Sequence, residues 1–178
     1  MGEYFTPIFL NTAGHIVCAL DPADYGSGLK LAGHTRADAP LMSAVLTLLA
    51  LDGGLRLVWA GDYADPDPGH QANLYFLVED RHFVRFDGLV ADGVAPNTPL
   101  GEAAASTREG YLCNLDKREY LAHTDLHADH TGWRRTPLPS LTVESERTTA
   151  NSQNFGGWAR DRLHYRRQHP GPGWAPRH

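Results

Sequence analysis

The sequence predicts an α+β fold with a mainly antiparallel sheet and one strong buried helix at about 39–52. Three observations carry this prediction. Short segments rich in β-branched and aromatic residues follow one another with turn residues between them, as antiparallel strands do. The stretch 41–49 has the apolar spacing of a helix with a wide buried face. Short phrases also recur in the same order at offsets of 97 to 103 residues, which predicts an internally duplicated fold.

The repeated phrases divide the chain into two unequal halves. They are Phe9-Leu10-Asn11 with Leu112-Cys113-Asn114, Pro40-Leu41-x-Ser43 with Pro137-Leu138-x-Ser140, and Trp59-Ala60-Gly61-Asp62 with Trp158-Ala159-Arg160-Asp161. We therefore expect half-repeats at 1–90 and 109–165, an Ala, Gly and Pro-rich linker at 91–108 and a flexible tail at 166–178. Together they are expected to form one compact domain.

The first half is expected to run from a hairpin through the helix to further strands. Its hairpin turns at Ala13-Gly14, Asp38 and Pro40 begin the helix as N-cap and first-turn residue, and Gly53-Gly54 ends it. The expected strands are 4–10, 16–20 and 55–60, followed by an acidic turn at 62–69 and a second hairpin of 73–79 and 82–86.

The second half is expected to repeat this order with a weaker helix. Its segments are strands at 111–115 and 119–122, a polar loop at 123–136, a short helix within 137–143 and a final strand at 156–165. The first half therefore holds the hydrophobic helix, and the second half holds a loop rich in His and Asp.

Composition limits the classes of function. The net charge of -5 gives no general attraction to nucleic acid or to an anionic membrane. The charge is uneven, because residues 1–89 hold five Lys and Arg against eleven Asp and Glu. Cys18 and Cys113 form no CxxC pattern, which favours free thiols in a reducing, cytoplasmic setting. No apolar run reaches the length of about 18 residues that a membrane helix requires.

The polar loop offers candidate metal ligands in Asp125, His127, Asp129 and His130. Imidazole and carboxylate groups suit a divalent ion such as zinc. The loop resembles the H-x-H-x-D-H loop of the metallo-β-lactamase superfamily, with Asp125 in the place of the first histidine. Only 48 residues follow His130, so the fold of that superfamily does not fit. The alternative is a polar loop of a His-rich protein that binds no metal.

The repeated aspartates and the late arginines are the other candidate site residues. If the two halves meet about a pseudo-dyad, Asp62 and Asp161 could form an acid/base pair. The favoured interpretation is structural, with the neighbouring tryptophans in the core and the aspartates accepting backbone N–H bonds. Lys30, Arg160 and Arg162 are candidate anion-binding residues, and the alternative is that they are solvated.

Several phrases together resemble a group of uncharacterised bacterial and phage-associated proteins. They are Met1-Gly2-x-Tyr4-Phe5, Gly28-Leu29-Lys30-Leu31, Trp59-Ala60-Gly61-Asp62-Tyr63-Ala64-Asp65, Asn114-Leu115-Asp116-Lys117-Arg118-Glu119-Tyr120-Leu121 and Gly157-Trp158-Ala159-Arg160-Asp161. This chain departs from that group at 148–154, where the similar proteins tend to have a Gly-rich stretch. The resemblance implies a bacterial, cytoplasmic setting and no particular substrate.

The sequence contains no nucleophile elbow, Walker loop or dinucleotide-binding glycine pattern. We therefore expect a non-catalytic binding or interaction module with an unknown protein or small-molecule partner, and with neither a membrane nor nucleic acid as partner. No cofactor is predicted. The alternative is a small metal-dependent hydrolase that uses the loop at 123–130, so the sequence leaves open whether the protein is an enzyme.

Overall fold

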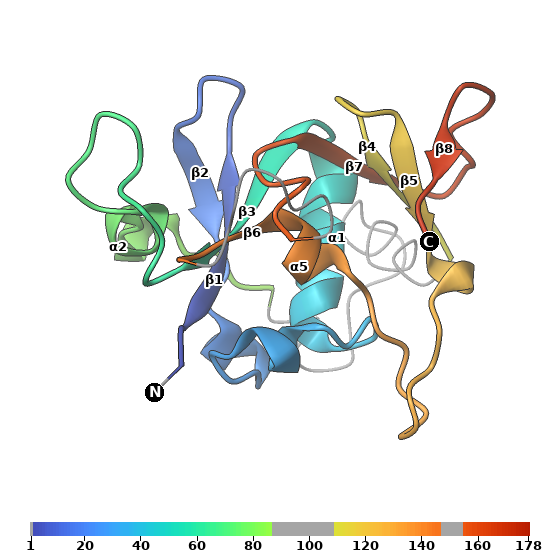
Figure 1. The fold of residues 1–178 in the computed structure, drawn as a ribbon, viewed down its shortest axis with the longest axis horizontal. Coiled ribbons are helices and arrows are strands. Elements are labelled where there is room, and N and C mark those ends of the chain that lie inside the picture. The colour runs from blue at the N-terminus through green and yellow to red at the C-terminus, as the bar shows by residue number, and fades with distance from the viewer. Residues whose placement is uncertain (1, 87–108, 147–154) are drawn as a thin grey trace.

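A computed structural model describes residues 2–86, 109–146 and 155–178 (Figure 1). Eight strands form one sheet in the order β2-β1-β3-β7-β4-β5-β8, and β6 pairs with β3. All pairings are antiparallel except β3 with β6 and β5 with β8. The strands are β1 (Phe5–Leu10), β2 (Ile16–Ala19), β3 (Leu55–Gly61), β4 (Tyr111–Asn114), β5 (Glu119–Ala122), β6 (Val143–Glu144), β7 (Arg162–Arg166) and β8 (Ala175–Pro176). The α+β class with a mainly antiparallel sheet is confirmed.

The described α-helices are α1 (Pro40–Leu51), α2 (Leu74–Leu77) and α5 (Leu138–Thr142). Short 3₁₀ segments lie at Pro22–Tyr25, Leu31–His34, Asp80–His82 and His123–Asp125. Seven of the twelve residues of α1 are buried, around most of the helix, and its last residue, Leu51, is exposed. The strong helix expected at about 39–52 is therefore present.

β3 is the centre of the sheet. One edge pairs with β1 along its whole length. The other edge is shared, because Leu55 and Arg56 pair with β7 while Trp59 and Ala60 pair with β6. Six of its seven residues are buried. The strand is thus covered on both faces and paired on both edges.

The helices join the two parts of the chain into one core. α1 packs against β7, and α5 packs against β3. The main hydrophobic cluster accordingly holds residues from both parts, including Leu57, Trp59, Trp158 and Leu163. A smaller cluster on the other face of β1 and β3 includes Ile8, Val58 and Leu74 of α2.

Both parts of the chain follow the order hairpin, helix, strand, and β3 lies beside β7. The repeated W-A-x-D phrases, however, do not occupy equivalent places. Trp59 lies inside β3, whereas Trp158 precedes β7 and donates from Nε1 to a Glu119 carboxylate oxygen at 2.7 Å. The internal duplication itself stays a prediction.

The structure corrects the expected second hairpin at 73–79 and 82–86. Residues 74–77 form α2, because the Asn73 side chain caps it and accepts the Phe76 N–H at 3.3 Å. Residues 80–82 form a 3₁₀ turn with Glu79 and His82 bonding reciprocally at its ends. Asn73, Glu79 and His82 therefore satisfy locally the backbone groups that a strand would offer to a neighbour.

Three further expectations change. Ala39, not Asp38, is the N-cap of α1 and makes no side-chain cap bond. The last long strand begins at Arg162, six residues after its expected start. The tail expected to be flexible pairs with β5 through β8, where the Arg177 N–H donates to the Tyr120 carbonyl at 2.8 Å. The expected linker at 91–108 lies outside the described residues.

A buried histidine holds the central strand to the segment before α1. His34 accepts the Trp59 Nε1–H at Nδ1, with a distance of 2.9 Å. Since the indole can only donate, Nε2 carries the ring proton and donates to the Gly28 carbonyl at 2.6 Å. Burial lowers the pKa of His34 below its ordinary value of 6.5, although the Gly28 bond opposes that shift. The imidazole is therefore neutral in the folded protein.

We expect this histidine to make stability depend on pH. Its folded-state pKa is lowered, so its contribution is complete above pH 6.5 and is lost as the pH falls below that value. Urea unfolding should show a falling free energy of unfolding from about pH 7.5 to about pH 5. His34→Gln should reduce that fall and cost about 2 kcal/mol at the higher pH.

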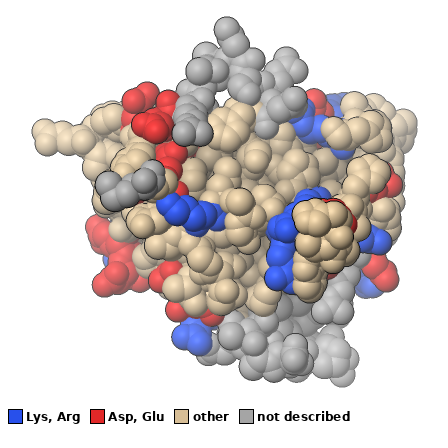
Figure 2. Space-filling view, turned by 60° about the horizontal axis from the view of Figure 1, so that its bottom comes forward, with Lys and Arg blue, Asp and Glu red and all other residues tan. Residues whose placement is uncertain are grey.

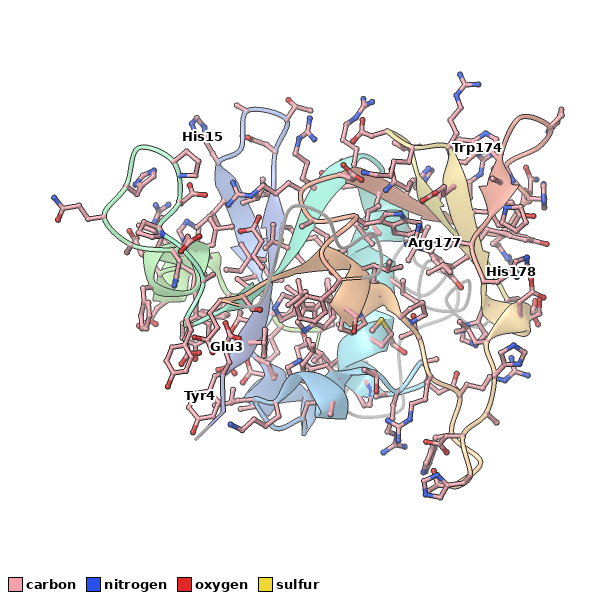
Figure 3. All side chains as sticks on the ribbon, in the orientation of Figure 1. Glu3, Tyr4, His15, Trp174, Arg177 and His178 are labelled. Atoms are coloured by element: carbon pink, nitrogen blue, oxygen red, sulfur yellow. The ribbon has the colours of Figure 1, made fainter. Side chains whose placement is uncertain are left out.

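His15 provides the control, because it is exposed at the turn of the first hairpin (Figure 3). His15→Gln should leave both the stability and its pH dependence unchanged. An unaltered pH dependence in the His34 variant would show that the lowered pKa of His34 does not govern acid stability.

Arg160 links β3, β6 and the acidic turn at 62–69 through hydrogen bonds. Its guanidinium donates to both carboxylate oxygens of Glu144, at 2.5 and 3.0 Å, and to Asp67 at 2.5 Å. Its backbone N–H donates to the Leu57 carbonyl at 3.0 Å. These bonds hold Arg160 at a φ of 64°, a left-handed conformation that is unfavourable for a residue with a Cβ atom.

The difference in stability between Arg160→Gly and Arg160→Ala should report the strain of the left-handed backbone at this position. Both Arg160→Ala and Arg160→Gly lose the bonds to Glu144 and Asp67, but only glycine relieves the backbone. We expect both variants to be less stable than the wild type, with the glycine variant about 1 kcal/mol more stable than the alanine variant. Urea unfolding at neutral pH measures the difference, and an alanine variant of equal or greater stability contradicts this account.

Candidate functional site

The structure does not bring the two candidate catalytic aspartates together. Asp62 directly follows β3, whereas Asp161 lies near the start of that strand, because Arg162 pairs with Arg56. Five residues of extended strand between these points span roughly 15 Å. Asp62 accepts the Tyr4 N–H at 2.9 Å, as the structural interpretation expects. Asp161 instead accepts from the Asn114 amide at 2.8 Å and pairs with Lys117. No acid/base pair forms between them.

The His and Asp loop forms a projecting hairpin, which we call the arm (126–136, lower right in Figure 1). Asp129 organises its tip by accepting from the Thr131 N–H, the Thr131 hydroxyl, the Trp133 N–H and Arg135 Nε. The hydroxyl and guanidinium bonds are the largest causes of a strongly lowered pKa for Asp129. Within 2–86, 109–146 and 155–178, no group of three or more His, Cys, Asp or Glu side chains could hold a metal ion. The four candidate ligands of this loop thus form no such group in the described structure.

The candidate anion-binding residues have partners inside the protein. Arg160 is paired as described above. Arg162 donates from Nε to an Asp116 carboxylate oxygen at 2.9 Å. The Lys30 ammonium lies 4.5 Å from the centre of the Tyr4 ring, so it belongs to a different surface from the two arginines.

The surface around Tyr4 is the most pronounced candidate site among the described residues. Among all the described residues, six large hydrophobic side chains are exposed. Three of them, Tyr4, Tyr63 and Phe76, lie on segments that are bonded to one another around Asp62. We call this group the aromatic–acidic surface and define it as Glu3, Tyr4, Asp62, Tyr63, Tyr75 and Phe76; the Lys30 ammonium lies over its Tyr4 ring.

Sequence-distant segments meet at this surface because hydrogen bonds from side chains and backbone groups join them. Tyr4 and Asp62 exchange backbone and side-chain bonds where β1 begins and β3 ends. The Asn73 amide donates to the carbonyls of Asp62 and Ala64, at 3.1 and 2.9 Å, and so joins α2 to the turn after β3. Figure 3 shows Glu3 and Tyr4 together at the start of β1, below α2.

Two neighbouring rings of this surface are in contact. The Tyr75 and Phe76 rings meet edge to face, with their centres 5.2 Å apart. Phe76 is the most exposed of the large hydrophobic side chains, at 64%. Burial, followed by the charge of Asp62, raises the pKa of Tyr75. Tyr75 is half-buried against the smaller hydrophobic cluster, while Phe76 projects into solvent.

Negative charge is concentrated at the same place. Burial raises the pKa of Glu3, and the nearby charges of Asp62 and Glu146 raise it further, against two backbone hydrogen bonds that lower it. Among the described residues, Glu3 and Asp62 form no ion pair with Lys or Arg. Figure 2 shows Asp and Glu side chains gathered on the side of β1 and α2. A cation brought here would relieve this like-charge repulsion.

A small cavity lies between α1 and the hairpin of β4 and β5, and it is lined mainly by apolar side chains such as Met42, Leu46 and Leu121. His123 is buried in its wall, with Nε2 3.4 Å from an Asp38 carboxylate oxygen. Burial is the main cause of the lowered pKa of His123, although Asp38 opposes it. Thr136 and Tyr165 in the same wall both accept backbone N–H bonds. Their oxygens therefore take part in the local structure, and the cavity is an extension of the core.

Comparisons with known proteins found no match to a family model, a curated protein or a solved structure. In the part of the chain that the structure describes, no helix is long and apolar enough to cross a membrane. The functional argument therefore depends on the surface itself.

The sequence analysis does not predict the aromatic–acidic surface. Tyr75 and Phe76 were assigned to a strand, in which alternate residues face the core, although α2 leaves Phe76 exposed. The available signal was Asn73, a favoured helix N-cap directly before an apolar run.

Proposed function

We propose that this protein is a non-catalytic binding module that holds a protein partner at the aromatic–acidic surface. The observation that carries the proposal is the exposure of Tyr4, Tyr63 and Phe76 at 41, 47 and 64% on segments bonded to one another around a pair of carboxylates. Exposed apolar groups with polar residues beside them are typical of interaction sites, and aromatic residues are enriched at interfaces.

The energetic basis of the proposal is burial of rings that are already ordered. Covering one exposed aromatic side chain contributes on the order of 1.5–3 kcal/mol. Tyr4 is held at its backbone by Asp62, and α2 is held by the Asn73 bonds. Binding therefore immobilises few additional groups, which lowers the entropic cost of association.

Charge selects the kind of partner. Glu3 and Asp62 form no ion pair among the described residues, so a Lys or Arg of the partner is attracted and an acidic segment is repelled. The long aliphatic stems of Lys and Arg also cover apolar surface while their charged ends reach the carboxylates. The partner that fits best is a basic segment that carries an apolar or aromatic residue next to its Lys or Arg.

Selection from a displayed library of random peptides tests this function on the whole chain. The wild type should enrich peptides in which Lys or Arg adjoins an aromatic or aliphatic residue. Tyr63→Ser and Phe76→Ser should each weaken binding of an enriched peptide about tenfold, because each removes ring area from the contact. Glu3 also accepts the Tyr63 N–H, and Glu3→Gln keeps an oxygen for that bond while it removes the charge, so this variant should reduce the preference for Lys and Arg.

Val17 and Leu51 provide matched controls, since they are exposed to a similar degree, 46 and 44%, on other elements. Val17→Ser and Leu51→Ser should leave peptide binding unchanged. Enriched peptides without basic residues, or equal loss in all four serine variants, would contradict the proposal.

A further inference from the structure

A second surface lies on the arm, away from the aromatic–acidic surface. Its hairpin is held by Asp129, by the bond from the Asp129 N–H to the Trp133 carbonyl at 2.9 Å and by the bond from the Arg135 N–H to the His127 carbonyl at 3.1 Å. Its base pairs with the segment before α1, because the Thr136 N–H donates to the Thr35 carbonyl at 2.8 Å. The arm is therefore an ordered projection in the described structure.

Arg36 and Trp133 form a stacked pair where the segment before α1 meets the arm. Arg36, in the segment before α1, forms an antiparallel bridge with Arg135 of the arm. Trp133 lies two residues before Arg135 and is therefore the diagonal neighbour of Arg36 on the same face. The Arg36 guanidinium carbon lies 3.5 Å from the centre of the Trp133 ring, and Trp133 is 45% exposed. Stacking orients the planar guanidinium before any ligand arrives.

Within the described structure, the Arg36 guanidinium also lacks an ion-pair partner, which a bound acidic group would supply. Arg36 Nε is buried and has no hydrogen-bond acceptor, a state that costs about 1–3 kcal/mol. Among the described residues, Arg36 forms no ion pair, whereas the neighbouring Arg135 is paired with Asp129 at 2.7 Å. In Figure 2, Lys and Arg side chains appear on both sides of the molecule, beside the acidic group as well as opposite it.

We infer that the Arg36–Trp133 face of the arm binds an acidic peptide segment of a protein partner. A carboxylate accepts charge-assisted hydrogen bonds from the Arg36 guanidinium, and an adjacent apolar residue covers the exposed part of Trp133. Among the described residues of this face, Arg36 is the one cation without an ion pair, whereas a nucleic-acid backbone is followed by a row of cations, and the net charge of -5 opposes a polyanion. This inference concerns a different surface and a partner of opposite charge, so it does not depend on the proposed function.

Calorimetric titration of the full chain tests the inference with a capped octapeptide in which Glu residues flank a Phe. The same peptide with Gln in place of Glu is the ligand control, and a single-stranded oligothymidylate of about ten nucleotides is the polyanion control. The Glu peptide should bind saturably, the Gln peptide should bind at least about tenfold more weakly, and the oligothymidylate should not bind.

Variants assign the binding to the stacked pair. Arg36→Ala and Trp133→Ala should each weaken the Glu peptide about tenfold, and Arg36→Lys should fall between the wild type and Arg36→Ala because it keeps the charge without the planar stack. Lys30→Ala removes one positive charge from the other surface and should change nothing. Amide hydrogen exchange at Thr131 checks that the arm keeps its Asp129 bonds in each variant.

Four results overturn the inference: no binding of the Glu peptide, equal binding of the Gln peptide, binding of the oligothymidylate alone, or unchanged affinity in Arg36→Ala with the arm intact. The serine variants of Tyr63 and Phe76 should bind the Glu peptide as the wild type does. Failure of one surface is thereby distinguished from failure of the other.

Discussion

The structure depends on the double pairing of β3. A strand buried on both faces must satisfy every backbone group by hydrogen bonding, since water cannot reach it. β1 satisfies one edge, and β7, the Arg160 N–H and β6 divide the other. This division brings the end of the chain onto its first part. It also explains why a residue with a Cβ atom is held in a left-handed conformation at Arg160, where the second edge changes from one strand to another.

The same strand separates the two surfaces and the two aspartates. Asp62 follows its end and is bonded to Tyr4, whereas Asp161 lies beside its start and is bonded to Asn114 and Lys117. Each carboxylate therefore stabilises its own end of the sheet. The two aspartates of the repeated phrase thus have local structural roles, and the exposed aromatic residues are the features on which the proposed function is based. The aromatic–acidic surface and the arm also differ in charge, so we infer that they select partners of opposite charge.

Local patterns predicted the elements whose stability is local. The first hairpin, α1 and the hairpin of β4 and β5 follow from apolar spacing and turn residues, and each lies close to its expected range. Prediction failed where a side chain competed with the backbone. Asn73 caps a short helix in a segment with strand-like composition, and Asp38 faces His123 instead of capping α1. The tail was expected to be flexible from its Pro and Gly content, but β5 offered a free edge to it.

The sequence by itself determined the α+β class, the single strong helix and the uneven charge of the chain, because these depend on composition and on contacts between near neighbours. Only the tertiary structure decided which residues stand together. Glu3, Asp62 and Phe76 come from three segments that are joined by bonds between side chains and backbone groups, and Arg36 reaches Trp133 across 97 positions of the sequence. Such juxtapositions depend on strand order and register, which are set by the burial of the whole sheet and leave no periodic signal in the chain.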